Sequence, residues 1–170
     1  MTELSTNSIR ILEIKYGTSV DGIGLRTSLY CAGCENRCPG CHNPQSWDEN
    51  EGETISINVL FHHIVEADMN VTFTGGDPML HPEGFIKLAE MIKRQTDKTI
   101  WCYTGYQFED LLLHPTRRKL VELCDVIVDG RYIEAERDLS LHFRGSRNQR
   151  IIDVAKSLAG KLNLLEFSSL

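Results

Sequence analysis

The stretch VTFTGGDPMLHPEGFIKLAEMI, residues 71–92, decides the fold of this chain. Its first four residues carry β-branched and aromatic side chains, which favours a buried strand that ends at the glycine pair Gly75-Gly76. Pro82 suits the first position of a helix, where the missing N–H has no partner to lose. The apolar side chains beyond it recur at helical spacing, at Phe85, Leu88, Ala89 and Ile92. The stretch therefore predicts a strand, a glycine turn and an amphipathic helix in succession.

The same succession recurs along the chain. The patterns predict strands at residues 9–15, 25–30, 100–103 and 125–128, and helices at 56–68, 108–113 and 117–123. Such alternation builds βαβ units, whose right-handed crossovers give a mostly parallel sheet that curls toward a barrel. A closed eight-unit barrel takes roughly 250 residues, whereas this chain has 170. We therefore expect an α/β fold, a partial β/α barrel that binds ligands at the carboxyl ends of its strands.

The domain organisation is expected to be simple. No repeat, low-complexity tract or Pro/Ser-rich linker divides the sequence, which predicts a single domain over residues 1–170. Its core is expected at about residues 9–154. In the tail, residues 155–170, Gly160 interrupts a helical apolar spacing, and the sequence leaves the structure of the tail open.

Composition excludes some partners. The formal net charge of −6 would repel a phosphate backbone, so binding to nucleic acid is not expected. The first 17 residues carry Glu3 and Glu13 and lack a long apolar run, so neither a secretory signal nor a membrane span is expected. These features favour a cytoplasmic protein.

Four of the six cysteines, Cys31, Cys34, Cys38 and Cys41, fall within eleven positions. The spacing Cys34-x3-Cys38-x2-Cys41 lets one short loop supply three thiolates to an iron-sulfur cluster, and one iron is then left open for a substrate. The alternative counts Cys31 as a fourth ligand, which would give a closed ferredoxin-like cluster or a structural tetrathiolate zinc site. Cys31 also ends a predicted strand, where a buried cysteine can simply fill space, as expected for Cys102 and Cys124.

Several motifs together resemble the radical S-adenosylmethionine enzymes, and among them the activases of glycyl-radical enzymes. The resemblance rests on the turn at residues 21–26 (DGIGLR), the cysteine loop with its continuation through Trp47, the sequence Gly75-Gly76-Asp77-Pro78, and residues 144–150 (RGSRNQR). The last motif and the short chain are similar to the branch that activates anaerobic ribonucleoside-triphosphate reductase. The resemblance implies a radical-SAM type of partial barrel that reductively cleaves S-adenosylmethionine and stores a glycyl radical on the reductase.

The resemblance also implies the site residues. A 4Fe-4S cluster would be bound by Cys34, Cys38 and Cys41, with no catalytic residue beyond these ligands. Residues expected to bind S-adenosylmethionine are Gly40, Cys41, His42, Gly75, Gly76, Asp77 and Thr104. Many members of the family carry an aromatic side chain where Gly40 stands, so here only backbone contacts to adenine can be expected.

The glycine-pair segment has two readings from its residues alone. Gly75 and Gly76 allow a ligand to approach the backbone, and the Asp77 carboxylate could receive an ammonium group. A plain strand-to-helix turn, with Asp77 accepting backbone N–H groups, is the alternative. Thr104 could likewise contact a ribose or form a turn.

Partner binding is expected late in the chain, at Asp129, Arg144, Asn148 and Arg150. The partners implied are the reductase and an electron donor such as flavodoxin or ferredoxin. A solvated basic surface is the alternative for residues 144–150. For the whole protein, the alternatives are a radical enzyme that acts on a small molecule, a closed iron-sulfur electron carrier, and a zinc-binding module.

Overall fold

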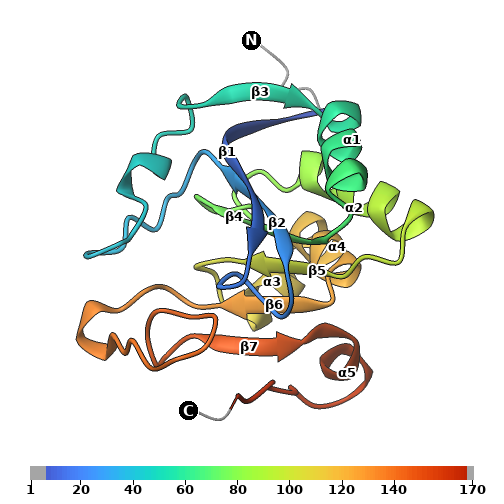
Figure 1. The fold of residues 1–170 in the computed structure, drawn as a ribbon. Coiled ribbons are helices and arrows are strands. Elements are labelled where there is room, and N and C mark those ends of the chain that lie inside the picture. Colours follow the sequence, from blue (N-terminus) through green and yellow to red (C-terminus); the bar gives the residue numbers. More distant parts are fainter. Residues whose placement is uncertain (1–6, 168–170) are drawn as a thin grey trace.

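Residues 7–167, which the computed structural model describes, form one seven-stranded sheet in the order β3-β1-β2-β4-β5-β6-β7 (Figure 1). The strands are β1 Ser8–Thr18, β2 Arg26–Cys31, β3 Glu53–Ser56, β4 Asn70–Gly75, β5 Ile100–Tyr103, β6 Val126–Asp129 and β7 Arg150–Asp153. The helices are α1 Ile57–Ala67, α2 Glu83–Gln95, α3 Phe108–Leu113, α4 Pro115–Leu123 and α5 Val154–Ala159, with 3-10 turns η1 Pro44–Ser46 and η2 Glu134–Glu136.

The sheet is parallel in its middle and antiparallel at its edges. The strands β2, β4, β5 and β6 pair in parallel, while β1 pairs antiparallel with β2 and β3, and β7 pairs antiparallel with β6. The expectation of a mostly parallel sheet is thus confirmed only for the four central strands. The strands β3 and β7 were not expected from the sequence, because each has four residues and few apolar side chains. They end the sheet on either side, and the barrel is not closed.

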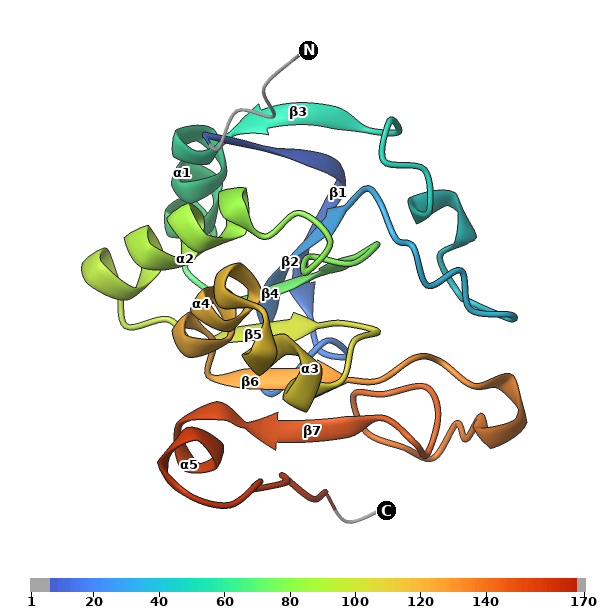
Figure 2. The same ribbon diagram turned by 180° about the vertical axis from the view of Figure 1, so that it is seen from behind.

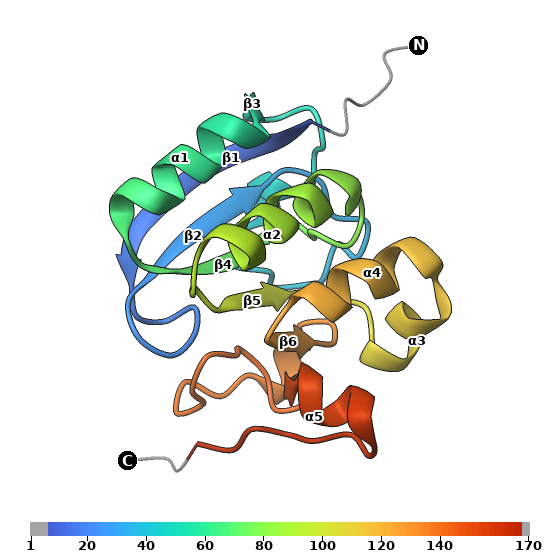
Figure 3. The ribbon, with the colours of Figure 1, turned by 90° about the vertical axis from the view of Figure 1, so that its right-hand side faces the viewer.

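The helices cover one face of this sheet, as Figures 2 and 3 show for α1, α2 and α4. Ser56 caps α1, because its side-chain oxygen accepts a hydrogen bond from the Val59 N–H at 3.2 Å. Pro82 lies one position earlier than expected and forms the N-cap of α2. Among residues 7–167, no helix is both long and apolar enough to cross a bilayer.

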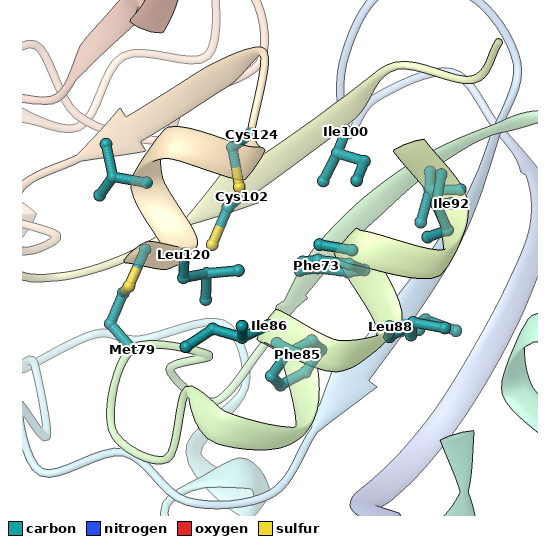
Figure 4. Packing of buried hydrophobic residues seen from close by; sticks show 14 of the residues in the cluster. Phe73, Met79, Phe85, Ile86, Leu88, Ile92, Ile100, Cys102, Leu120 and Cys124 are labelled. Carbon is teal, nitrogen blue, oxygen red and sulfur yellow. The ribbon is translucent and has the colours of Figure 1, made fainter. Parts of the chain in front are cut away.

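The main hydrophobic core fills the space between the helices and the sheet (Figure 4). Phe85 of α2 packs against Phe73 of β4, with ring centroids 4.7 Å apart and ring planes inclined at 49°. The apolar spacing predicted for α2 is buried as expected. Cys102 and Cys124 lie in the same core as free thiols, which confirms their role as space-filling side chains.

A smaller apolar cluster covers part of the other face, which we call the inner face. Trp101 and Val128 belong to it, and Phe143 and Phe167 pack against it. The segment after α5 runs back along β7, where the Leu165 N–H donates to the Ile151 carbonyl at 2.7 Å. The tail therefore ends its helix at Ala159 and then packs along β7, where Leu165 and Phe167 cover part of the inner face.

One buried arginine fixes the amino ends of three central strands. The Arg26 guanidinium donates to Thr72 Oγ1 and to the carbonyls of Val71 and Thr99, and it lies over the Trp101 ring. Burial lowers the pKa of Arg26 to about 10. A side chain on Gly22 would approach both Arg26 and Trp101 to 2.8 Å, so this glycine lets the preceding turn fold over the arginine. Residues 21–26 thus have a structural role at the amino-terminal ends of the central strands.

Candidate metal and cofactor site

The loops that carry the predicted motifs meet along one edge of the sheet. The parallel strands end at Cys31, Gly75, Tyr103 and Asp129, and each is followed by one of these loops. Figures 1 and 2 show the cysteine loop and the segment after β6 projecting on the same side of the molecule. The cysteine loop and the glycine pair thus lie at the carboxyl ends of the parallel strands as expected, whereas residues 21–26 precede β2 and lie at the opposite, amino-terminal ends.

The cysteine loop is held by its own return segment. The Gly33 N–H donates to the Ser46 carbonyl at 2.7 Å, and the Cys34 N–H donates to the Trp47 carbonyl at 3.3 Å. The Ser46 hydroxyl is buried; it donates to the Asn43 carbonyl and lies 3.3 Å from the Gly75 carbonyl. The return segment thereby ties the cysteine loop to the end of β4.

The three predicted thiol ligands lie on this loop in different surroundings. Cys38 is buried, whereas Cys34 and Cys41 are half-buried. The Cys41 N–H donates to the Cys38 carbonyl at 3.0 Å, which forms a tight turn between these two ligands. Among the residues that the structure describes, no three Cys, His, Asp or Glu side chains stand close enough together to hold a metal ion. The loop therefore carries the three thiols on one short segment, but their sulfur atoms do not surround a common metal position.

The chemistry of these thiols fits an iron-sulfur cluster. Thiolates are the ligands that such clusters prefer, and hydrogen bonds to the sulfur atoms tune them. Such donors are present, since the Asn43 N–H reaches Cys41 Sγ at 3.4 Å and Asn36 Nδ2 lies 3.9 Å from Cys34 Sγ. Partial burial raises the pKa of the Cys34 thiol, which a bound cation would reverse.

Cys31 differs from these three cysteines. It is 3% exposed and packs in the main hydrophobic core. Burial raises the pKa of its thiol far above the ordinary value, which favours the neutral form. This environment suits a space-filling cysteine better than a fourth ligand.

The glycine pair packs directly against the start of the cysteine loop. A Cβ atom on Gly75 would collide with the backbone of Tyr30 and Cys31, and one on Gly76 would collide with the Gly33 carbonyl. The Gly76 N–H donates to the Cys31 carbonyl and the Asp77 N–H donates to the Gly33 carbonyl, both at 2.7 Å. The backbone that approaches these glycines is thus the chain's own, and their contact with a ligand stays a prediction.

Asp77 is buried among hydrogen-bond donors. Its carboxylate accepts from the N–H groups of Met79 and Gly105 at 2.9 Å each, and from the Thr104 hydroxyl at 3.1 Å. Burial raises the pKa of Asp77, while these hydrogen bonds oppose the rise. These contacts are the ones expected if Asp77 stabilises a turn between strand and helix, and Thr104 takes part in the same structural contacts. Binding of an ammonium group by Asp77 stays a prediction.

Asn36 connects the cysteine loop to this carboxylate, and the sequence analysis missed it. Its Nδ2 donates to Asp77 Oδ2 at 3.2 Å and also points to Cys34 Sγ. A side chain on Gly105 would collide with Asn36. The only available signal was its position between Cys34 and Cys38, and that position alone does not reveal a partner.

The other end of the cysteine loop contacts the segment after β6. Tyr132 lies edge-on to His42, with ring centroids 5.4 Å apart and planes inclined at 61°. Arg131 donates to the Asn36 carbonyl. The segment was expected to face a partner protein, yet two of its side chains hold the cysteine loop.

The inner face carries a hollow of about 370 Å³ between the turn at residues 19–21 and residues 141–145. Tyr103 lines the hollow together with Asp21. The Asp21 carboxylate accepts from the hydroxyls of Ser28 and Tyr30, at 3.0 and 2.7 Å. This hollow opens on the face that the helices leave uncovered.

Comparison with known proteins agrees with this arrangement. Residues 20–152 match the family model described as a 4Fe-4S single cluster domain. The anaerobic ribonucleoside-triphosphate reductase-activating protein of Haemophilus influenzae is 34% identical over 148 residues, which cover 78% of this chain and 90% of the relative. The proteins of the same name from Escherichia coli K12 and phage T4 are 35% and 34% identical, over 76% and 78% of this chain and 89% and 86% of their own lengths.

The chain belongs to the anaerobic ribonucleoside-triphosphate reductase-activating protein family.

In this member of the activating-protein family, two of the residues predicted to contact a partner are engaged internally. Asp129 is 1% exposed and is paired with Arg150, whose Nη2 lies 2.5 Å from Asp129 Oδ2. Arg150 also binds Glu109 at the start of α3, at 2.7 Å. These contacts join β7, β6 and α3, and contact with a partner stays a prediction for both residues.

The segment of residues 144–149 forms a loop closed by its own hydrogen bonds. Gln149 Oε1 accepts from the N–H groups of Gly145 and Ser146, and Arg144 donates to the carbonyls of Arg147 and Gln149. Asn148 donates to the Arg131 carbonyl at 2.7 Å. The motif that resembles the activating-protein branch therefore shapes a loop that packs on the segment after β6. A partner-binding role for Arg144 and Asn148 stays a prediction.

Proposed function

We propose that this chain is a radical S-adenosylmethionine enzyme that installs a glycyl radical on an anaerobic ribonucleoside-triphosphate reductase. The observation that carries the proposal is the three-thiol loop packed on the Gly75-Gly76 turn, at the carboxyl edge of an open α/β sheet. Relatives that share about a third of its residues bear the name of such activating proteins.

The thiols of Cys34, Cys38 and Cys41 would hold the cluster as thiolates. When bound there, a 4Fe-4S cluster with an open iron supplies the electron that splits S-adenosylmethionine into methionine and a 5′-deoxyadenosyl radical. Gly75, Gly76 and Asp77 would border the methionine end, and Gly40, Cys41 and His42 would border the nucleoside. The residues of the chain position these groups and exclude water, while the cofactors carry the chemistry.

The substrate in this proposal is a glycine Cα–H on a peptide segment of the reductase. An open inner face suits a peptide better than a small molecule, because nothing in residues 7–167 closes over the hollow beside Asp21. The electron is proposed to come from a flavodoxin or ferredoxin. The reaction is proposed to take place in the cytoplasm, where six free thiols stay reduced.

The test begins with anaerobic reconstitution of the chain with iron and sulfide. Reduced protein, S-adenosylmethionine and the reductase are then mixed without oxygen, and electron paramagnetic resonance is used to look for a glycyl doublet on the reductase. We expect deoxyadenosine and the doublet together. Deoxyadenosine without a protein radical would favour a small-molecule radical enzyme. A cluster without any cleavage would favour an electron carrier, and a colourless protein that binds zinc tightly would favour the zinc module.

A further inference from the structure

Tyr132 brings an aromatic ring to the third predicted cluster ligand from a distant part of the sequence. It follows β6 and lies edge-on to His42, the neighbour of Cys41, with ring centroids 5.4 Å apart. Tyr132 is half-buried and His42 is exposed, so both rings remain accessible to a small molecule. An aromatic pair thus stands beside the cysteine loop.

Two glycines make room for this ring. A Cβ atom on Gly40 would lie 3.3 Å from Tyr132 Cε1 and would collide with the Glu134 carboxylate. A Cβ atom on Gly145 would lie 3.2 Å from Cδ2 and Cε2 of the same ring. Gly40, which precedes Cys41, therefore has no side chain, and the Tyr132 ring occupies the space beside it.

The ring is also held in place at its far end. Its hydroxyl donates to Glu134 Oε2 at 2.7 Å, and Glu134 belongs to the 3-10 turn η2 that follows. The neighbouring Arg131 donates to the Asn36 carbonyl, so the segment is attached to the cysteine loop at a second point. A ring fixed in this way loses little conformational freedom when a ligand stacks on it.

We infer that Tyr132, together with His42, forms the aromatic wall that binds the adenine of S-adenosylmethionine. The inference rests on the proposed function. A cosubstrate whose amino acid end is bound to a cluster on Cys34, Cys38 and Cys41 must place its nucleoside close to the same loop. Purine rings stack on aromatic side chains, and each such contact contributes about 1–3 kcal/mol. Tyr132 would thus replace, from outside the loop, the ring that Gly40 lacks.

The test compares two sulfonium ligands on anaerobically reconstituted protein with an oxidised cluster, so that no turnover occurs. S-adenosylmethionine carries adenine, whereas S-methylmethionine has the same amino acid and sulfonium groups without it. Both are titrated against wild-type protein and against Tyr132→Leu, Tyr132→Phe and Tyr16→Leu, with binding followed by the cluster spectrum. Tyr16→Leu is the control, because it removes an exposed tyrosine of β1. Iron content is measured for every variant.

We expect Tyr132→Leu to weaken S-adenosylmethionine binding about five- to a hundredfold. Its affinity for S-methylmethionine and its iron content should stay at wild-type values, and Tyr132→Phe and Tyr16→Leu should bind both ligands normally. Equal losses for the two ligands would show that Tyr132 only positions the cysteine loop, and unchanged affinities would show no role; either result overturns the inference. Wild-type protein that holds a cluster but binds neither ligand would instead overturn the proposed function.

Discussion

Asp77 illustrates how one side chain can serve both the fold and the site. Four donors surround its carboxylate, from Met79, Thr104, Gly105 and Asn36. They link the end of β4 with the end of β5 and with the cysteine loop. A ligand that also donated a hydrogen bond to the Asp77 carboxylate would therefore meet an oxygen whose position the fold already fixes.

We predict that Asp77→Asn lowers the free energy of unfolding by about 1–3 kcal/mol, because an amide nitrogen cannot accept the hydrogen bonds that one carboxylate oxygen accepts. Urea denaturation of the cluster-free chain measures this change. Asp68→Asn is the control, since Asp68 is exposed and pairs only with Lys98 among the described side chains.

The proposed ammonium contact adds a second expectation for the same variant. A charge-assisted hydrogen bond is worth about 1.5–3 kcal/mol, so S-adenosylmethionine should bind roughly ten- to a hundredfold more weakly to reconstituted Asp77→Asn. If the stability falls while the affinity does not change, Asp77 is a structural residue only.

The four clustered cysteines should respond differently to substitution. We predict that Cys34→Ala, Cys38→Ala and Cys41→Ala each lose the cluster iron and its broad visible absorption, which arises from thiolate-to-iron charge transfer. Cys31→Ala should keep both, because Cys31 lies in the hydrophobic core. Iron analysis and absorption spectra after anaerobic reconstitution decide the matter. Equal loss of iron in all four variants would point to a four-thiolate site.

At the scale of elements, the cysteine loop has almost no regular structure and depends on its neighbours for its shape. The turn after β4, the end of β5 and the segment after β6 each contact it, through Gly76, Gly105 and Arg131. A substitution at Gly76, Gly105 or Arg131 should therefore lower cluster binding, although none of these residues is a predicted ligand.

Gly76→Ala tests this dependence. The added Cβ would collide with the Gly33 carbonyl, so the start of the cysteine loop must move away from β4. We predict lower iron incorporation and a loss of about 1–3 kcal/mol in the free energy of unfolding, as is usual for an overpacked site. Gly160→Ala is the matched control, since its Cβ would meet nothing within 4 Å. Full iron loading in Gly76→Ala would contradict the packing argument.

One arginine of β7, Arg150, joins this strand to β6 and to α3. We predict that Arg150→Ala lowers the free energy of unfolding by about 3 kcal/mol, because it leaves Asp129 buried without its counter-charge. This is the lower end of the usual range, since the Arg150 side chain is 27% exposed. Arg118→Ala, which breaks an exposed pair with Glu122, should cost only about 0.3–0.5 kcal/mol.

The effect of Arg150→Ala should also depend on pH. Arg150 lowers the pKa of Glu109 through a side-chain hydrogen bond. A carboxyl group whose pKa is lower in the folded state stabilises the fold above its unfolded pKa, about 4.3, and loses this contribution as the pH falls. The difference in unfolding free energy between wild type and Arg150→Ala should therefore be largest near neutral pH and shrink in acid. Denaturation curves across this range would contradict the pairing if the difference stayed constant.

At the scale of the whole molecule, local sequence patterns predicted most of the fold. The strand at 100–103 and the helix at 108–113 have the predicted bounds, because buried apolar runs and helical spacing are local signals. The edge strands β3 and β7 were not predicted, since each has only four residues, too few for a clear pattern, and becomes a strand by pairing with β1 or β6. For the same reason, the sequence did not reveal that β3 and β7 pair antiparallel with β1 and β6.

The candidate site was predictable to a similar extent. The spacing of Cys34, Cys38 and Cys41 predicts a ligand loop, and the structure places this loop at the carboxyl ends of the parallel strands. Asn36 and Tyr132 could not be identified, because their roles arise from contacts with residues far away in the sequence, such as the pair Arg131 and Asn36, which are 95 positions apart. Only the folded sheet brings these residues together.

This separation has a consequence for how the protein is made. The cysteine loop leaves the ribosome early, but its shape depends on Gly76, Gly105 and Arg131, which are synthesised much later. If these thiols bind the cluster as proposed, we therefore expect iron and sulfide to be delivered to a completed chain and not to a nascent one. Until then, the cell has to keep the three thiols reduced and unoccupied by competing metals such as zinc.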